Sequence, residues 1–423
     1  MKVLWLINVP LPIIARDCHL KVVPYGGWLV ELANRISKYD DTELYICFKQ
    51  SEKNALLRGN VEDITYYGFF EDVFKADMIS RDQEKLFHDL LMEVQPDIIQ
   101  IFGTEHLHSF VMTKACSDCG YMNRTIITVQ GLVSVIARHY YSDLPFWVRY
   151  GYTLRDIFRG NTCSLRKKYL RIGNYEEEII RMSQYVIGRT DWDRACATRL
   201  NDKIHYYTNN ETLRLSFYNK TWDYHRCQKH SIFCSQAGSP IKGFHFVLEA
   251  LTDILNVFPD TQVYLAGEDI QTKKSYKRTS YQQYLISYIK KKKLTDKIVF
   301  LGNLQEDQMV EAYLNANVFV CSSSIENSPN SLCEAMLLGM PVVSADVGGV
   351  KDLIEHNREG YIYQHDAPYM LAYYVKKVFA MKDEITPLCE AAKMHAMNTH
   401  CIEKNVEDLR RIYQDIALQN ECE

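Results

Sequence analysis

Short apolar runs alternate with amphipathic segments along most of the chain, and this alternation predicts its elements. In the first half, runs with few polar residues predict strands at 2–8, 43–48, 64–67, 97–102, 125–129 and 185–188. Between them, apolar residues recur with helical spacing at 28–38 and 81–94. Continuous apolar runs are typical of parallel strands that are buried on both faces, so we expect a parallel sheet covered by helices.

The alternation stops in the polar, irregular stretch 206–230, where we place a linker, and then starts again. Later apolar runs predict strands at 231–235, 262–266, 297–301 and 318–321, and helical patterns occupy 276–293 and 306–316. A chain of 423 residues also exceeds what a single core usually supports. We therefore predict an α/β chain with two domains, at 1–208 and 209–398, followed by a helical segment at 399–423.

The stretch 318–363 carries the clearest candidate chemistry. A buried strand ends in a loop with Glu326, a short helix with Glu334 follows, and a Gly-Gly pair interrupts the next loop. Backbone N–H groups and the helix dipole converge at such a helix start, which favours binding of an anion. The two carboxylates would repel phosphates, so they are better suited to accept hydrogen bonds from the hydroxyls of a ribose or a sugar. Alternatively, Ser331 and Glu334 form a capping box that only satisfies the helix end.

The spacing of Glu326 and Glu334, with AMLLGMPVVSADVGGVKDLI after it, resembles the signature of retaining glycosyltransferases of family 4. The segments GTEH, VQGLVS, GRTDWDRA and NETLR resemble bacterial glycosyltransferases that assemble surface polysaccharides. The resemblance implies the GT-B fold, with two facing Rossmann-like domains and a last helix that crosses back to the first. It also implies transfer of a sugar from a nucleoside diphosphate donor to a hydroxyl of a glycan or a polyprenyl-diphosphate-linked acceptor.

Several positions of the second domain match residues with known roles in that family. Lys242 stands where a turn gives way to a helix, and its point charge suits a leaving diphosphate. The resemblance implies that Glu326 binds the donor sugar and that Glu334 binds the ribose. Backbone groups at the helix start would bind the diphosphate, which makes four further residues candidates: Asn327, Ser328, Asn330 and Ser331. The family's arginine near the lysine is absent here, because Gln236 or Ala237 occupies its place.

Polar residues at predicted strand ends of the first domain are candidates because ligands bind beyond the carboxyl ends of parallel strands. They are Glu105, His106, Gln130 and Arg189. We expect Glu105 and His106 to be catalytic, Gln130 to face the acceptor in place of the family's usual histidine, and Arg189 to bind the donor. Glu105 and His106 could instead only cap the helix that follows.

The pair Gly26-Gly27 follows the first predicted strand. Glycine lets the backbone approach a ligand closely, and in the family this loop lies beside the donor diphosphate and the acceptor. A plain turn is an equally good interpretation of the pair from the sequence alone.

Asp191 and Asp193 match the D-x-D pattern that binds a metal in the other major glycosyltransferase fold. Thr190 and Asp193 also have the spacing of a helix N-cap pair, and we favour that interpretation. The sequence shows no second acidic cluster that would complete an octahedral oxygen site. We therefore predict no metal and no cofactor besides the donor substrate.

Aromatic and basic residues interleave between 138 and 171, with few acids. One interpretation is a helical insertion whose aromatic residues belong to the core. The other is a surface that meets a membrane or a polyphosphate acceptor, because such residues suit an anionic interface. Periodicity alone does not separate the two.

The amino-acid composition excludes some classes of protein but does not indicate a function. A hydrophobic content of 47% and a charged content of 24% are typical of a soluble globular protein, and a net charge of −4 gives no general attraction to nucleic acid. The 13 cysteines show no disulfide framework, which indicates free thiols in a reducing cytoplasm. The N-terminal apolar run is short and interrupted, so we interpret it as a strand rather than a signal peptide.

Two rival functions fit the same sequence. A nucleotide-sugar epimerase shares the fold and the diphosphate site but would consume donor without any acceptor. A non-catalytic scaffold that binds nucleotide sugars would fit the missing arginine and histidine.

Overall fold

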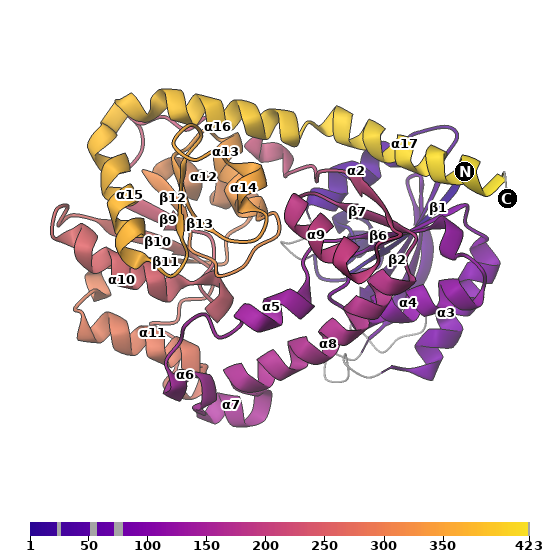
Figure 1. The fold of residues 1–423 in the computed structure, drawn as a ribbon, viewed down its shortest axis with the longest axis horizontal. Coiled ribbons are helices and arrows are strands. Elements are labelled where there is room, and N and C mark those ends of the chain that lie inside the picture. Colours follow the sequence, from indigo (N-terminus) through magenta and orange to yellow (C-terminus); the bar gives the residue numbers. More distant parts are fainter. Residues whose placement is uncertain (23–26, 51–56, 72–78, 422–423) are drawn as a thin grey trace. The chain divides into compact units, whose positions relative to one another are not determined.

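The computed structural model describes residues 1–22, 27–50, 57–71 and 79–421 (Figure 1). The chain forms two compact units. Unit 1 comprises Met1–Val135, Lys168–Arg214 and His400–Glu423, and unit 2 comprises Ile136–Lys167 and Leu215–Thr399. Each unit is built on its own sheet, fully parallel in unit 2 and parallel except for one strand in unit 1, so the predicted α/β fold class with two sheet domains is confirmed.

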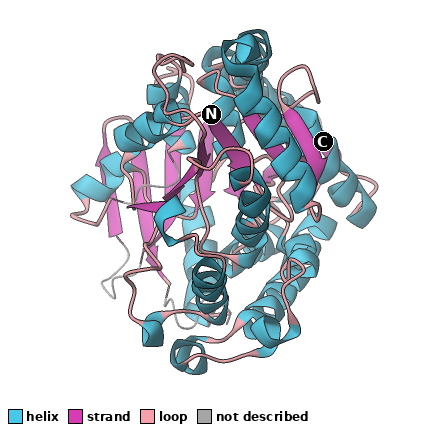
Figure 2. Ribbon diagram, turned by 90° about the vertical axis from the view of Figure 1, so that its left-hand side faces the viewer, coloured by secondary structure: helices cyan, strands magenta, loops and turns pink. Residues whose placement is uncertain are grey.

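Unit 1 contains an eight-stranded sheet with the order β3-β4-β2-β1-β5-β6-β7-β8, parallel except for β3. Its strands are β1 (Lys2–Ile7), β2 (Glu43–Gln50), β3 (Leu57–Val61), β4 (Ile64–Phe70), β5 (Ile98–Phe102), β6 (Thr125–Thr128), β7 (Tyr185–Gly188) and β8 (His205–Thr208). The central strands β5, β6 and β7 are buried at every position, which is typical of parallel strands covered on both faces. Figure 2 shows the helices and strands of the chain from a second side. β8 overlaps the start of the stretch 206–230 that we predicted as a linker.

The described helices of unit 1 follow the strands, as in other parallel sheets. They include α1 (Pro12–Asp17), α2 (Trp28–Ile36), α3 (Arg81–Val94), α4 (Leu107–Asp118), α9 (Asp191–Leu200) and α17 (Ile402–Glu421). α17 lies beside α2 and β5, and the Trp5 indole N–H donates a hydrogen bond of 2.9 Å to the hydroxyl of Tyr413 (Figure 1). The hydroxyl of Tyr185 donates one of 2.8 Å to Gln419.

Unit 2 contains a six-stranded parallel sheet with the order β11-β10-β9-β12-β13-β14. Its strands are β9 (Ser231–Cys234), β10 (Gln262–Ala266), β11 (Ile298–Gly302), β12 (Val318–Cys321), β13 (Val342–Asp346) and β14 (Tyr361–Gln364). Its α-helices after β9 are α10 (Phe244–Leu255), α11 (Ser280–Lys291), α12 (Glu306–Asn315), α13 (Asn330–Leu337), α14 (Val350–Leu353), α15 (Pro368–Met381) and α16 (Thr386–Thr399).

Residues Ile136–Lys167 lie within the range of the first predicted domain, but they pack in unit 2. They include most of α5 (Val133–His139), all of α6 (Phe146–Tyr150) and α7 (Leu154–Arg159), and the start of α8 (Thr162–Met182). The physical reason is a set of specific contacts: His245 donates a hydrogen bond of 2.8 Å to the carbonyl of Ser142, and the Ser280 amide donates one of 2.8 Å to Asp156. Among the described residues, none of the helices has the length and apolar character needed to cross a bilayer.

Candidate active site

Two loops at the carboxyl ends of the neighbouring strands β9 and β12 are bound to each other. The amide of Ser324 donates a hydrogen bond of 2.8 Å to the carbonyl of Ile241, and the hydroxyl of Ser322 donates one of 2.9 Å to the carbonyl of Lys242. Gly243 has a φ of +67°, and a Cβ there would overlap the carbonyl oxygen of Ser322. The glycine after Lys242 is thus required both by its backbone conformation and by the close approach of the second loop.

These loops bring two of the predicted site residues into direct contact. The ammonium of Lys242 lies 2.6 Å from a carboxylate oxygen of Glu326, and the hydroxyl of Ser323 donates a hydrogen bond of 2.6 Å to the same oxygen. The two side chains are 29% and 15% exposed, so the pair is partly shielded from solvent but still reachable. A phosphate that binds Lys242 would therefore compete with Glu326 for the same cation.

The Gly-Gly loop after β13 packs on the backbone of Glu326. The amide of Gly349 donates a hydrogen bond of 3.2 Å to the carbonyl of Glu326. Gly348 has a φ of +51°, and a Cβ at this position would overlap the same carbonyl oxygen. The two glycines thus hold the backbone of Glu326 through contacts separate from those of the Lys242 loop.

The helix that carries Glu334 begins at Asn330, with Pro329 as its N-cap and without a side-chain cap. The alternative interpretation of a capping box formed by Ser331 and Glu334 is therefore wrong, since Ser331 already lies inside the helix. Glu334 is buried. Its side chain does not cap the helix end.

The loop that precedes α13 is also buried, at Asn327 and Ser328. The hydroxyl oxygen of Ser328 is buried with no hydrogen-bond partner among the described residues. A buried hydroxyl normally has a partner, so an unpaired one beside a helix start is consistent with a ligand atom that completes it.

In unit 1, three predicted residues follow the adjacent strands β5, β6 and β7. They are Glu105, Gln130 and Arg189. The buried guanidinium of Arg189 forms an ion pair of 2.8 Å with Glu211 and donates a hydrogen bond of 2.8 Å to the carbonyl of Gln130. Its remaining Nε is buried without a partner in the described part of the chain. The structure therefore places Arg189 in unit 1, in a buried network with Glu211, a residue that the sequence analysis did not single out.

Glu105 has an unusual electrostatic environment. Burial raises the pKa of its carboxyl to about 7, and the charge of Glu176 adds to this shift. One carboxyl oxygen accepts a hydrogen bond of 3.2 Å from the Asn8 side chain, and the other is buried with no partner among the described residues. A carboxyl with a pKa near neutrality can gain and lose a proton during a reaction.

His106 stacks on the ring of His108 with 5.0 Å between the ring centroids. Burial and nearby positive charge lower the pKa of His106 to about 3, so this imidazole is neutral. His106 occupies the N-cap position of α4, but its side chain forms no capping hydrogen bond. The alternative that this pair caps the helix is therefore met in position by His106, although not through a side-chain hydrogen bond.

His108, which sequence reasoning missed, is fully buried and links two strand ends. One ring nitrogen lies 2.7 Å from Glu71 and the other 2.9 Å from Asn8. Glu71 also pairs with Lys49 at 3.0 Å. The two histidines in GTEHLH were the one signal in the sequence for a role of His108. Its partners could not be predicted, because they follow strands that are distant in the sequence.

Gly27 lies at the start of α2, where a Cβ would lie 3.1 Å from the side chain of Arg214. Gly26 lies outside the described residues, so its role stays a prediction.

The helix-cap interpretation of Thr190 and Asp193 is confirmed, because the Asp193 amide donates a hydrogen bond of 3.2 Å to the Thr190 hydroxyl. Within residues 1–22, 27–50, 57–71 and 79–421, no group of three His, Cys, Asp or Glu side chains is arranged to hold a metal ion.

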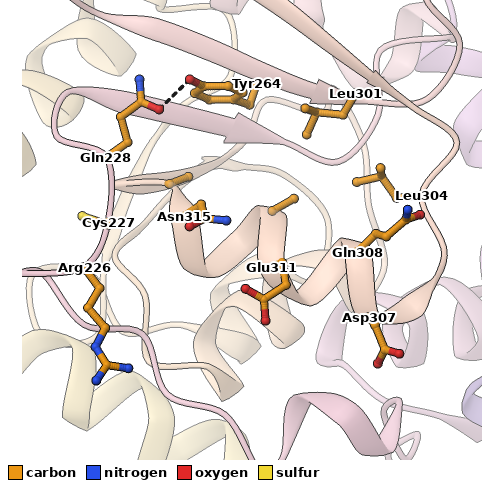
Figure 3. A pocket seen from close by; sticks show the side chains of 12 residues that line it. Arg226, Cys227, Gln228, Tyr264, Leu301, Leu304, Asp307, Gln308, Glu311 and Asn315 are labelled. Atoms are coloured by element: carbon orange, nitrogen blue, oxygen red, sulfur yellow. Dashed lines mark hydrogen bonds between the residues drawn. The ribbon is translucent and has the colours of Figure 1, made fainter.

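A cavity of about 710 Å³ lies elsewhere in unit 2, beside α12 and the strands β10 and β11 (Figure 3). Leu301 and Leu304 line it, and the hydroxyl of Tyr264 donates a hydrogen bond of 2.5 Å to Gln228 at its edge. None of the predicted site residues lines this cavity. The candidate site is the pair of loops around Lys242 and Glu326, not this cavity.

The chain is similar to known proteins in part of its sequence and in its fold. Residues 226–396 match the model of the family described as Glycosyl transferases group 1. The Bacillus subtilis protein YtcC is 26% identical over 183 residues, which cover 42% of this chain and 43% of that protein, less than half of its length.

Two solved structures share the fold over nearly the whole chain. Sucrose-phosphate synthase from Thermosynechococcus elongatus superposes with a TM-score of 0.73 at 13% identity, covering 98% of this chain and 99% of that one. Anabaena Alr3699/HepE in complex with UDP-glucose superposes with a TM-score of 0.66 at 15% identity, covering 100% of both chains. The chain therefore matches the glycosyl transferases group 1 model over residues 226–396, less than half of its length, and shares the GT-B fold of these solved structures.

Proposed function

We propose that this chain is a retaining glycosyltransferase of family 4 that transfers a sugar from a nucleoside diphosphate donor to a hydroxyl acceptor. The observation that carries the proposal is the Lys242–Glu326 ion pair of 2.6 Å, whose Glu326 lies in the loop that leads to buried Glu334. These three residues are the ones expected to meet phosphate, sugar and ribose. A solved structure of the same fold contains UDP-glucose, which supports a nucleotide sugar as the donor.

The main task of such an enzyme is to stabilise negative charge on the leaving diphosphate. In the proposed reaction Lys242 exchanges Glu326 for the diphosphate, and backbone N–H groups at 327–331 add hydrogen bonds. Glu326, released from its cation, accepts hydrogen bonds from the donor sugar. The mechanism assigns charge stabilisation to Lys242 rather than to a metal ion, and it requires no cofactor.

Unit 1 is proposed to handle the acceptor, through Glu105, His106 and Gln130. Glu105 is the group suited to accept the proton of the acceptor hydroxyl, because its pKa of about 7 allows it to be either protonated or ionised at neutral pH. The segments GTEH, VQGLVS and NETLR favour an acceptor of surface-polysaccharide assembly, either a glycan or a polyprenyl-diphosphate-linked sugar. Such an acceptor would place the enzyme in the cytoplasm, at the inner face of the membrane.

A thermal-shift screen against UDP-, GDP- and ADP-sugars tests donor binding, and analysis of products with and without an acceptor tests the reaction. Retention predicts that NMR finds the donor's anomeric configuration in the product. Consumption of the donor without an acceptor would indicate an epimerase instead, and binding without any product would indicate a scaffold.

Glu334→Gln is expected to weaken donor binding by about 1–3 kcal/mol, the usual cost of losing a buried charged acceptor. Isothermal titration calorimetry with the donor found in the screen measures this loss. The matched control is Glu384→Gln, an exposed glutamate of the same unit. Unchanged donor affinity in Glu334→Gln would remove the ribose role from this residue.

A further inference from the structure

The exposed large hydrophobic residues of unit 2 concentrate on α6, α7 and the turn that joins them. Phe158 is 86% exposed and Phe146 75% exposed, values typical of a residue with almost no neighbours. The full set, which we call the α6–α7 surface, is Phe146, Trp147, Tyr150, Tyr152, Leu154, Ile157 and Phe158. Isolated exposed apolar residues need no explanation, but seven within 13 residues of chain form an interaction surface.

The elements that carry this surface are firmly attached to unit 2. Leu144 and Val148 are fully buried, and Trp147 packs edge-on against Tyr284 of α11, with 5.4 Å between the ring centroids. The hydroxyl of Thr153 donates a hydrogen bond of 2.7 Å to the carbonyl of Arg278. The segment is therefore an ordered insertion, and its exposed side chains are presented by fixed backbone.

The only acidic residue between 144 and 167 serves the fold. Asp156 is 1% exposed, completes the capping box of α7 with Thr153, and accepts a hydrogen bond of 2.8 Å from the Ser280 amide. Asp143, just before the segment, faces His365 at 3.7 Å. Glu268, in the loop after β10, pairs with Lys273 at 2.6 Å. The α6–α7 surface itself therefore presents no exposed carboxylate.

Cations border the same surface. Arg149 and Arg166 lie over the ring of Tyr141, at 5.2 and 5.0 Å, so they belong to the packing of the segment. Arg159 and Lys167 are exposed on α7 and α8. The turn Ser275–Lys277, which packs on α7, adds exposed Lys274 and Lys277 at or next to it. Lys168 and Arg171, which the sequence grouped with these residues, belong to unit 1.

We propose that the α6–α7 surface docks unit 2 on an anionic lipid membrane. Aromatic side chains on two short helices, of five and six residues, can enter the interfacial region, while the bordering cations meet lipid phosphates. Charge complementarity favours lipid over a protein partner, because every exposed charge between 144 and 167 is positive. This inference goes beyond the proposed transfer reaction and does not depend on it, since docking requires no catalysis.

Co-sedimentation of the full chain with vesicles of equal parts phosphatidylglycerol and phosphatidylcholine tests the proposal. We expect binding that weakens with salt and is absent with pure phosphatidylcholine. Each cation near an anionic surface contributes about fivefold to partitioning, so Arg159→Glu with Lys167→Glu should reduce it by at least about twentyfold. Phe146→Ser with Phe158→Ser should also reduce it at least about tenfold.

Tyr369→Ser with Tyr373→Ser is the matched control, because these tyrosines of α15 are 66% and 55% exposed in the same unit. We expect this variant to bind vesicles as the wild type does, and all variants to keep their affinity for the nucleotide-sugar donor. The proposal is overturned if the wild type stays in the supernatant at low salt, or if Phe146→Ser with Phe158→Ser binds normally. Concentration-dependent self-association in size-exclusion chromatography that this variant abolishes would also overturn it, in favour of a second copy of the chain.

Discussion

The ammonium of Lys242 lies 2.6 Å from a carboxylate oxygen of Glu326, so a substitution of either residue leaves the other without its opposite charge. Lys242→Ala is expected to lower kcat by about 10²-fold or more, and to raise KM less, because the lysine's contact strengthens as the diphosphate leaves. Steady-state kinetics measure both effects. Lys242→Ala combined with Glu326→Gln should cost less than the sum of the single changes, since the two residues act as a pair.

Lys351→Ala provides the comparison for this pair. Lys351 lies 2.9 Å from Asp346 in the same unit, but it is 69% exposed. A surface pair of this kind contributes little, so kcat should stay within a few-fold of wild type. If Lys242→Ala behaved like Lys351→Ala, the leaving diphosphate would be stabilised by another residue.

Glu105 predicts a pH dependence of stability. Burial, reinforced by the charge of Glu176, raises the pKa of Glu105 to about 7 in the folded protein, whereas a glutamate in an unfolded chain has a pKa of about 4.3. The folded state therefore binds a proton on Glu105 more tightly than the unfolded state does. The stability that this proton contributes is fully present below about pH 4.3 and is lost as the pH rises through about 7. The free energy of unfolding of the wild type should fall between pH 5 and pH 8, and in Glu105→Gln this fall should be smaller by about 1–3 kcal/mol. Urea denaturation at both pH values measures it; parallel profiles for the two proteins would contradict the assigned pKa.

At the scale of elements, the approach of α8 to the start of α5 depends on Gly173. A Cβ at this position would lie 2.7 Å from the Cα of Ser134, closer than real Cβ contacts allow. One turn further along α8, Glu176 accepts hydrogen bonds of 2.8 and 2.9 Å from the amides of Val133 and Ser134. Gly173→Ala should therefore destabilise the protein by about 1–3 kcal/mol through overpacking, although alanine favours helix.

Asn174→Ala is the control for Gly173→Ala, because Asn174 is exposed on the same helix. Its thermal unfolding should be unchanged or shifted slightly upward, since alanine is the better helix former. A Gly173→Ala protein as stable as this control would show that α5 can move away from α8 at no cost.

Element prediction succeeded where local patterns decide the structure. The apolar runs of β5, β12 and most other central strands are buried on both faces, so their pattern is unmistakable. It failed for β3 (Leu57–Val61) and β8 (His205–Thr208), whose burial is only partial and whose sequences are more polar. Such edge strands are determined by pairing with a neighbour, which a single stretch of sequence does not reveal.

Across the whole molecule, the sequence predicted the two-sheet fold and the residues of the Lys242 and Glu326 loops. It did not predict that these two side chains pair, because their residues are 84 positions apart. The link of His108 to Glu71 and Asn8 was missed for the same reason, since it joins α4 to the ends of two separate strands. The assignment of Ile136–Lys167 to unit 2 depends on contacts such as Ser280 to Asp156, which periodicity cannot show.

The docking of α17 on unit 1 has a consequence for the order in which the chain folds. Trp5 in β1 finds its hydrogen-bond partner in Tyr413, 408 positions later, and Tyr185 finds Gln419. During synthesis, the first sheet must therefore wait for residues His400–Glu423 while all of unit 2 emerges from the ribosome. Contacts between such distant residues slow folding and leave apolar surface exposed in the meantime. Unit 1, although begun first, is the one completed last.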